Sequence, residues 1–402
     1  MVDTLARHEC PAITARRSRR ATALGAANDD PLVWQEACGA NVRDADGNVF
    51  VDLTSGFGVA FVGHRHPEIV EAAKQQSNHL IHALGDSSPD VTRIALLQLL
   101  GQYCPGELSV SILGLSGSDA VDAAVKTAVL ATGRHGIVTF DGSYHGLSLG
   151  IVALQAYKSA FVAPFKEITH PRVYQLPWGC EPQKVEDLVR SNEVGLVLAE
   201  PIQGRGGMRP PPTGWLAQVS EATKVNGAVF ALDEIQTGFG RTGSWFACNQ
   251  EDLVPDLICV GKALGGGYPI SACVGRREVM DCWGASTGEA LHTQTFLGHP
   301  IGCATAIAVI NLLARDKLPQ RAADVGNTLA NALTERGFSL RGRGLMQAVI
   351  IDDALAISRR LLQKGFLALP AGKNGEVLGL TPPVCLTEAQ IQAFADTMAE
   401  VT

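Results

Sequence analysis

The sequence predicts an α/β protein, with a large domain built on a mainly parallel central sheet flanked by helices and a smaller α+β C-terminal domain. Two observations support this prediction. Short, continuous apolar runs of strand length alternate with helical stretches through the middle of the chain, as expected for a parallel sheet buried on both faces. After residue 302 helical segments dominate, and only one strand, over residues 345–351, is evident.

Residues 1–40 are polar and irregular, and a hairpin is predicted directly after them. Residues 41–53 place Asp46-Gly47-Asn48 between two apolar runs, and an Asp-Gly pair at such a position is a strong turn signal. We therefore assign residues 1–54 to an N-terminal arm and hairpin, residues 55–302 to the large domain and residues 303–402 to the small domain.

The elements of the two domains follow from the spacing of apolar residues. In the large domain, an alanine-rich helix over residues 118–132 ends at Gly133, a residue that often terminates helices, and a second helix covers residues 214–225. The predicted strands of this domain span residues 109–115, 136–140, 194–200, 228–233, 257–260 and 270–274. The predicted helices of the small domain include residues 303–315, 354–364 and 388–399.

Composition excludes several classes of protein. The formal net charge of −7 argues against nucleic-acid binding, which needs a basic surface. No apolar run approaches the roughly 18 residues of a membrane span. The ten cysteines include no CxxC pair, so we expect reduced thiols and a cytoplasmic location. Paired arginines at 16–17 and 19–20 resemble a twin-arginine signal, but the weakly apolar segment after them favours a solvated arm.

Two loops that follow predicted strands suggest ligand contacts. In the first, Ser116, Gly117 and Ser118 join a strand to a helix, where free N–H groups and the helix dipole favour a phosphate; an ordinary N-cap is the alternative. In the second, Tyr144 and His145 lie between glycines and could contact a planar ligand, or form a plain turn. Histidines elsewhere lack acidic or cysteine partners at ligand spacing, so no metal site is predicted.

Two further strand ends carry charged residues. Asp233 ends an apolar strand, where open α/β sheets bind ligands and where a carboxylate needs a cationic or N–H partner. The following Gly238–Gly243 segment matches GxGxxG, the dinucleotide motif, but neither a strand nor a helix adjoins it directly. Lys262 follows another apolar strand and precedes three glycines. Apolar neighbours would lower its pKa and favour imine chemistry, whereas a surface lysine is the alternative.

Together, a phosphate cup, an aromatic ring, a buried carboxylate and a lysine in apolar surroundings are the groups that hold pyridoxal phosphate. The chain resembles the class III (ornithine and 4-aminobutyrate type) aminotransferases, which are fold-type-I pyridoxal phosphate enzymes. The resemblance extends from residues 44–47 to 381–383, and its most specific motifs are LDEIQTGFGRTG at 232–243, VGKALGGG at 260–267 and TFLGHP at 295–300.

The resemblance implies roles for individual residues. Lys262 would be the Schiff-base lysine and general acid–base, and Asp233 would pair with the pyridine nitrogen. Other cofactor contacts would come from Gly117 and Ser118 at the phosphate, Tyr144 on the ring, Gln236 near the phenolic oxygen, and Glu200 as a buttress. Thr295 would reach the phosphate of the neighbouring subunit, which implies a homodimer with shared active sites.

Three positions depart from the family pattern and concern the substrate. Arg205 stands where many members that use glutamate have a glutamate, and Gly379 stands where many have an arginine that grips the donor's carboxylate. Phe57 replaces a tyrosine common in ornithine-type members. We therefore hypothesise that Arg205 has taken over binding of a substrate carboxylate, with a solvent-facing side chain as the alternative.

The sequence thus predicts a cytoplasmic, homodimeric aminotransferase that moves an amino group from an amino donor to a keto acid or aldehyde acceptor in two half-reactions. A decarboxylase or aminomutase of the same superfamily is the nearest alternative. A nicotinamide-dependent dehydrogenase using the segment 238–243 and a non-catalytic regulator that binds pyridoxal phosphate are more remote.

Overall fold

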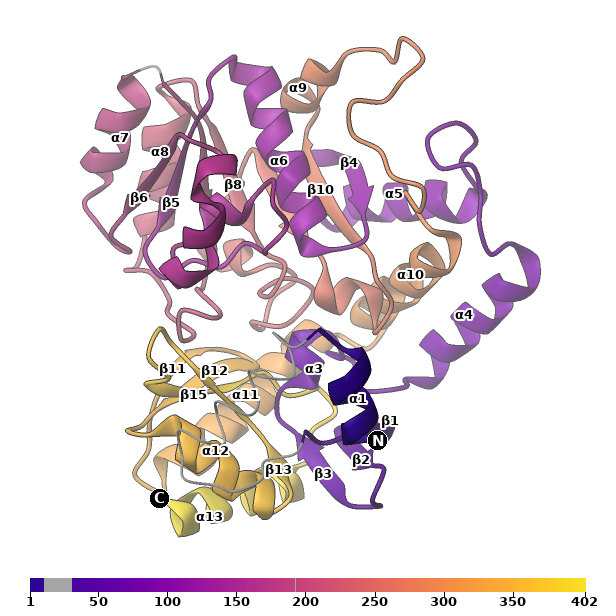
Figure 1. Ribbon diagram of the computed structural model, residues 1–402, viewed down its shortest axis with the longest axis vertical. Helices are drawn as coiled ribbons and strands as arrows, with labels where there is room; N and C mark the ends of the chain where they lie inside the picture. The colour runs from indigo at the N-terminus through magenta and orange to yellow at the C-terminus, as the bar shows by residue number, and fades with distance from the viewer. Residues whose placement is uncertain (11–30, 192) are drawn as a thin grey trace.

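The structure, a computed structural model, describes residues 1–10, 31–191 and 193–402 (Figure 1). It contains one seven-stranded sheet and two four-stranded sheets. The paired arginines at 16–17 and 19–20 lie outside the described residues. Within the described part of the chain, no helix is long and apolar enough to cross a bilayer.

The seven-stranded sheet forms the centre of the large body. Its order is β4-β10-β9-β8-β7-β5-β6, and the strands are β4 Leu108–Gly114, β5 Gly136–Phe140, β6 Val173–Leu176, β7 Val194–Ala199, β8 Val229–Asp233, β9 Leu257–Val260 and β10 Ser271–Arg276. Only β10 runs antiparallel to its neighbours. A short connection, which holds only the 3-10 segment Lys262–Gly265, joins β9 to β10. Parallel pairing needs a longer crossover. The mainly parallel sheet is therefore as predicted.

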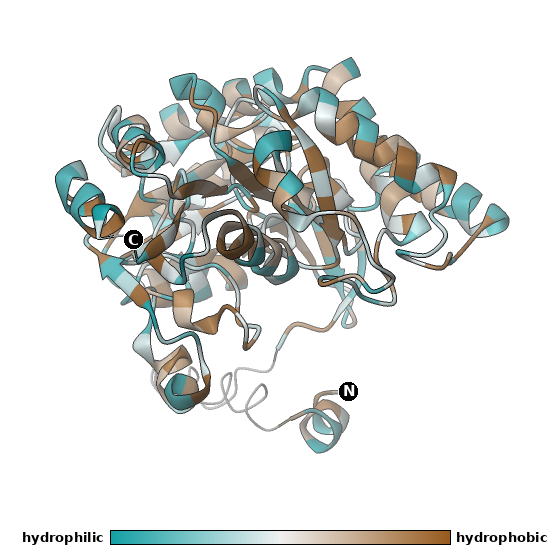
Figure 2. Ribbon diagram, turned by 90° about the horizontal axis from the view of Figure 1, so that it is seen from above, coloured by the Kyte–Doolittle hydropathy of each residue, from teal (hydrophilic) through white to brown (hydrophobic). Residues whose placement is uncertain are grey.

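Both faces of this sheet are covered. On strand β8, Val229 and Ala231 belong to the hydrophobic cluster that includes α6 (Gly117–Thr132), while Phe230 and Leu232 belong to the cluster on the other face. Because successive side chains of a strand point to opposite faces, burial on both sides requires an unbroken apolar run. Figure 2 shows the hydrophobic residues concentrated in the central strands and on the inner surfaces of the helices.

The remaining helices of the large body surround the sheet. Helix α5 packs against β4, α7 packs against α8, and α10 packs against both α4 and α5. Their bounds are α4 Pro67–His79, α5 Val91–Tyr103, α7 Pro182–Arg190, α8 Trp215–Lys224, α9 Arg277–Met280 and α10 Pro300–Arg315. The short helix α3, Ser55–Gly58, lies instead beside the smaller sheets (Figure 1), where the Ser55 hydroxyl donates to the carbonyl group of Thr381.

The two smaller sheets lie together in the lower part of Figure 1. One has the order β1-β2-β3-β13 and the other β11-β12-β15-β14, and α11, α12 and α13 pack with them. The bounds are β1 Trp34–Cys38, β2 Asn41–Asp44, β3 Val49–Asp52, β11 Ser339–Arg343, β12 Met346–Ile350, β13 Phe366–Leu367, β14 Leu369–Ala371, β15 Val377–Leu380, α11 Leu318–Thr334, α12 Ala354–Gln363 and α13 Glu388–Val401. The predicted hairpin is present as β2 and β3, with the Asp44 carboxylate accepting the N–H groups of Asp46 and Asn48 in its turn.

Two contacts bear on the predicted domain boundaries at residues 54 and 302, which remain predictions. Strand β13, late in the chain, pairs in parallel with β3, so the N-terminal hairpin shares a sheet with the C-terminal segment. Helix α10 begins at Pro300 and contributes Cys303 and Ala306 to the same core as the central sheet. Packing thus joins segments that the linear division would separate.

The structure also contains elements that the sequence did not predict. Residues before 41 were interpreted as irregular, but they include α1 (Val2–His8) and β1. Helix α1 buries no residue, and β1 is an edge strand whose side chains are all at least partly exposed. Neither segment therefore carries the apolar periodicity on which a sequence-based assignment depends.

Candidate active site

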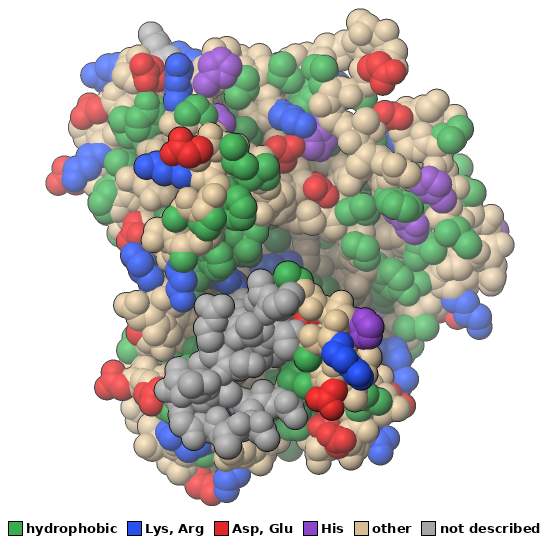
Figure 3. All heavy atoms as spheres, viewed as in Figure 1, with side chains coloured by type: hydrophobic (Ala, Val, Ile, Leu, Met, Phe, Trp, Pro, Cys, Tyr) green, Lys and Arg blue, Asp and Glu red, His purple; other side chains and the backbone are tan. Residues whose placement is uncertain are grey.

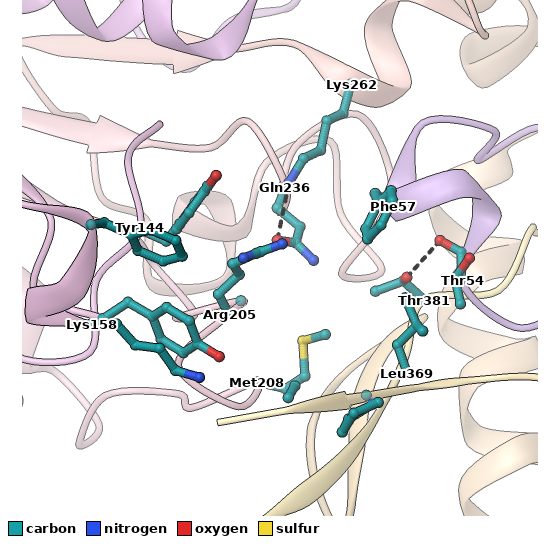
Figure 4. Close-up of a pocket in the computed structure, with 16 residues that line it drawn as sticks. Thr54, Phe57, Tyr144, Lys158, Arg205, Met208, Gln236, Lys262, Leu369 and Thr381 are labelled. Atoms are coloured by element: carbon teal, nitrogen blue, oxygen red, sulfur yellow. Dashed lines mark hydrogen bonds between the residues drawn. The ribbon is translucent and has the colours of Figure 1, made fainter. Parts of the chain in front are cut away.

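A cavity of about 550 Å³ lies beyond the ends of β8 and β9, against strands β14 and β15 (Figure 4). It brings together five residues that the sequence singled out, Phe57, Tyr144, Arg205, Gln236 and Lys262, with Gly379 on the opposite wall. The rest of the lining is Thr54, Tyr157, Lys158, Phe161, Gly204, Met208, Leu369, Pro370, Ala371 and Thr381.

Lys262 enters the cavity from the tight turn after β9. It opens a short 3-10 segment, Lys262–Gly265, with a backbone φ of 43°, a conformation uncommon for a residue with a side chain. Its Nζ donates a hydrogen bond of 3.0 Å to Oε1 of Gln236. Burial lowers the pKa of Lys262 to about 8, although the nearby negative charges of Asp233 and Glu200 oppose that shift. A neutral amine is therefore accessible near neutral pH.

Asp233, the last residue of β8, is paired with a histidine. Its Oδ2 lies 2.7 Å from Nδ1 of His145, and its Oδ1 accepts the N–H of Ile235 at 3.1 Å. Both side chains are buried, and Nε2 of His145 has no hydrogen-bond partner among the described residues. The sequence grouped His145 with Tyr144 as a possible ligand contact, whereas the structure places it against the carboxylate.

Glu200 follows β7 and holds two loops together. Its Oε1 accepts the N–H of Tyr144 at 2.9 Å, and its Oε2 accepts the N–H of Gly204 at 3.0 Å. Burial raises the pKa of Glu200 to about 7, with the Asp233 charge acting in the same direction and His145 opposing it. The carboxylate thus fixes the loop that presents Tyr144 relative to the loop that carries Arg205.

The N-terminus of α6 lies at the same edge of the sheet. Ser116 caps the helix, and Oδ2 of Asp119 accepts hydrogen bonds from the N–H groups of Leu115 and Ser116. The first N–H groups of a helix have no partner within it, so those of Gly117 and Ser118 are directed beyond its end. The predicted N-cap is therefore present, and these N–H groups stay available for the phosphate contact, which remains a prediction.

Comparison with known proteins identifies the family. The sequence profile of the family Aminotransferase class-III matches residues 24–402. The chain belongs to the class III aminotransferases. An acetylornithine aminotransferase of Mycolicibacterium smegmatis is 37% identical over 380 residues, 92% of this chain and 93% of that protein. One from Methanopyrus kandleri is 33% identical over 374 residues, 92% of this chain and 94% of that protein.

Solved structures show the same fold. The ornithine aminotransferase of Toxoplasma gondii has a TM-score of 0.85 at 27% identity, covering 93% of this chain and 91% of that one. The adenosylmethionine-8-amino-7-oxononanoate aminotransferase of Methanocaldococcus jannaschii has a TM-score of 0.85 at 26% identity, covering 93% of each chain. Another structure of the Toxoplasma enzyme has partial occupancy of PLP (pyridoxal phosphate) at its active site. The class III aminotransferases depend on this cofactor.

The groups present in this aminotransferase fit pyridoxal phosphate. The end of α6 offers unpaired N–H groups for a phosphate, Asp233 offers a buried carboxylate, and Lys262 offers an amine of lowered pKa. Two glycines near the start of α6 have no room for a side chain. A Cβ on Gly117 would lie 2.8 Å from Cδ1 of Ile235, and one on Gly146 would overlap the Ser118 hydroxyl. Such close approach is a reason for glycine at a ligand-binding loop.

Not every predicted residue of the aminotransferase lines the cavity. Gly117, Ser118, Asp233 and Glu200 lie outside its described lining, although Asp233 and Glu200 both influence the Lys262 amine. Thr295 is exposed and also lies outside the lining.

The sequence suggested no role for Arg241, a fully buried residue of the motif at 232–243. Its guanidinium donates to the carbonyl groups of Gly58, Leu345 and Pro382, and it lies 4.9 Å from the ring of Phe61. Desolvation lowers its pKa to about 9. It therefore joins the loop after β8 to segments from both ends of the chain. The surrounding segment 238–243 forms turns and opens no helix, unlike a dinucleotide-binding loop.

Proposed function

We propose that the cavity around Lys262 is the active site in which this aminotransferase passes an amino group from an amino donor to a carbonyl acceptor. The observation that carries the proposal is the convergence of three groups at one edge of the sheet: the Lys262 amine, the Asp233 carboxylate and the N-terminus of α6. They come from β9, β8 and the segment after β4, and parallel strands bring such ends together.

Each residue then has a defined task. When bound, pyridoxal phosphate supplies an aldehyde that takes up the amino group and a ring that draws electrons from the substrate's Cα–H bond. Lys262 would provide the amine that binds the cofactor. It would then accept the proton from the donor's Cα and, in the second half-reaction, deliver a proton to the carbon of the acceptor that receives the amino group. Asp233, oriented by His145, keeps a proton on the ring nitrogen, while Gly117 and Ser118 hold the phosphate.

The remaining cofactor contacts are positioning residues. Tyr144 would contact the ring, and Glu200 accepts the N–H of Tyr144 and so fixes its backbone. Gln236, which accepts a hydrogen bond from Lys262, would contact the phenolic oxygen. These side chains exclude water from the reacting atoms and hold their orientation.

A stoichiometry experiment tests the reaction type. Purified protein loaded with cofactor is mixed with each of a set of amines, including ornithine and N-acetylornithine, with and without a keto acid. We expect a productive donor to yield about one carbonyl product per active site without acceptor and many with it. Continued turnover without acceptor, accompanied by release of carbon dioxide, would instead identify a decarboxylase.

We also propose that the enzyme is a homodimer whose partner sits on the face formed by α4, α5 and the loop before α10. Exposed apolar side chains gather here, as Figure 3 shows on the side that carries α4 and α5; they are Leu80, Ile81, Leu84, Val91, Ile94 and Phe296. A patch of this kind marks an interaction surface. The carbonyl oxygen of Thr295 lies 3.8 Å from a Cβ built on Gly85, which places Thr295 on the same face.

A subunit-mixing experiment tests the shared site. If Thr295 serves the partner's phosphate site, Lys262→Ala and Thr295→Trp subunits should each have little activity alone. Co-refolding them should restore activity, because one site of the heterodimer then has both an intact Lys262 and an intact Thr295. Mixing Lys262→Ala with a Thr293→Trp variant, changed two residues away, serves as the control. Full activity in an isolated monomer would contradict the shared site.

We propose a cytoplasmic location because the cysteine thiols form no disulfides. All ten cysteines are free, and most are buried. Structural disulfides are typical of oxidising compartments and rare in the cytosol, so reduced thiols support a reducing compartment.

A further inference from the structure

The charges that the described residues bring to the active-site cavity are all positive. Its described lining contains three cations, Lys158, Arg205 and Lys262, and no carboxylate. Lys262 is assigned to the cofactor under the proposed function. Arg205 and Lys158 therefore remain as the charged groups that a substrate can meet.

The guanidinium of Arg205 is available to a ligand, whereas its backbone is fixed by a hydrogen bond. Its guanidinium carbon lies 4.6 Å from the ring centre of Tyr144 and 6.0 Å from that of Tyr157. Its backbone carbonyl accepts the N–H of Gly372, whose own carbonyl accepts the hydroxyl of Tyr157 at 3.0 Å. None of the hydrogen bonds or salt bridges between described residues involves the Arg205 guanidinium. A guanidinium carries five N–H donors, and that of Arg205 belongs to a residue of the cavity lining.

Arg205 also lies near the reacting atoms. Its charge is one of those that lower the pKa of Lys262. Figure 4 shows its side chain directed toward the hydrogen bond between Lys262 and Gln236. A group bound by Arg205 would therefore be close to the carbon that carries the amino group.

On the opposite wall, the described lining holds no second cation for a carboxylate and no counter-charge for Arg205. Gly379 lines the cavity without a side chain, and a Cβ there would lie 3.2 Å from Cβ of Ala371 and 3.3 Å from Cε of Met208. Neighbouring side chains thus occupy the space into which a longer residue would extend. A substrate without negative charge would leave Arg205 desolvated and unpaired, which is costly for a charged group.

We propose that Arg205 selects the substrates of this aminotransferase, binding a carboxylate close to the reacting carbon in both the donor and the acceptor. The inference rests on the proposed function and names its substrate class: amino acids and keto acids, in preference to simple amines and aldehydes. A planar guanidinium suits bidentate binding of a carboxylate, and stacking on Tyr144 orients it. Phe57, Phe161 and Leu369 in the lining favour an apolar substrate body.

Two unreactive probes test the proposal independently of turnover. Neither 3-phenylpropanoate nor 3-phenylpropanol has an amino or carbonyl group that can react, and the two differ mainly in the carboxylate. Calorimetry on the cofactor-loaded wild type and on Arg205→Gln should show about 10- to 100-fold weaker binding of the acid to the variant. The alcohol should bind the variant at least as tightly as the wild type, because the neutral probe no longer leaves a buried guanidinium unpaired. Arg209→Gln, on the same loop but outside the lining, is the matched control.

The outcomes separate this proposal from the proposed function. Equal losses for acid and alcohol, no loss for either, or the same selective loss in Arg209→Gln would overturn the role of Arg205. A selective loss in Lys158→Gln with none in Arg205→Gln would overturn it as well, because recognition would then lie at the other cation. In steady-state assays, Arg205→Gln should lower kcat/KM for amino acids by a similar factor without lowering it for simple amines. Absence of any transamination would count against the proposed function and leave the binding result standing.

Discussion

Replacing Lys262 with alanine is expected to reduce the rate of transamination by at least about 10²- to 10⁴-fold, the range that general acid–base catalysis by one side chain supplies. The Lys262 amine is buried, its pKa is lowered to about 8, and it donates a hydrogen bond to Gln236. The groups assigned to the phosphate and the ring nitrogen stay intact in the variant. Cofactor should therefore remain bound, although without a covalent link.

Mass spectrometry after borohydride reduction measures that link directly. The wild type should carry a pyridoxyl group on the peptide that contains Lys262, and the Lys262→Ala variant should carry none while retaining cofactor after gel filtration in native buffer. Lys166→Ala, a change at an exposed lysine, controls for nonspecific labelling. A pyridoxyl group on Lys158 or any other lysine of the wild type would contradict the assignment.

The positions of the principal site residues were predictable from the sequence because they depend on local signals. Asp233 and Lys262 each end or follow an unbroken apolar run, and Gly117 starts an alanine-rich helix directly after a strand. The carboxyl ends of parallel strands meet at one edge of a sheet, so the sequence alone is enough to expect these residues to converge. The observed strands β8 and β9 and helix α6 place them there.

Contacts between distant segments were not predictable. His145 and Asp233 are 88 residues apart, and nothing in the composition of either loop indicates that an imidazole meets that carboxylate. The same holds for Arg241, whose carbonyl partners include Gly58 and Pro382. A charged residue in a glycine-rich turn suggests a surface position. Its burial follows only from the way the hairpin and the C-terminal segment close over the turn.

The consequences of two departures from the family pattern, Arg205 and Gly379, depend on how their neighbours pack and could not be derived from the sequence alone. The sequence left open whether Arg205 faces solvent, and the structure places it in the cavity lining. At Gly379, the space that a longer side chain would need is occupied, because Met208 and Ala371 pack closely against this glycine. A substitution of Gly379 alone would therefore meet these side chains before it reached a substrate.

Replacing Asp233 with alanine is expected to slow the first half-reaction by about 10²- to 10³-fold, the usual cost of removing one preorganised group that stabilises a developing charge. Cofactor affinity should fall less, by about 10- to 100-fold, which corresponds to losing one charge-assisted hydrogen bond. The difference arises because electron density reaches the ring nitrogen mainly in the transition state. Stopped-flow single turnovers at saturating cofactor measure the rate apart from occupancy.

His145 makes this experiment specific to the carboxylate. His145→Gln removes the 2.7 Å contact with Asp233 but leaves the acid and its hydrogen bond from Ile235, so the single-turnover rate should fall by a smaller factor than in Asp233→Ala. Thermal unfolding of both variants without cofactor reports any structural damage from breaking the buried pair. If Asp233→Ala loses stability but keeps a near-normal single-turnover rate, Asp233 serves the fold rather than the chemistry. If the two variants lose rate equally, the effect comes from the pair as a unit and the carboxylate has no separate electrostatic role.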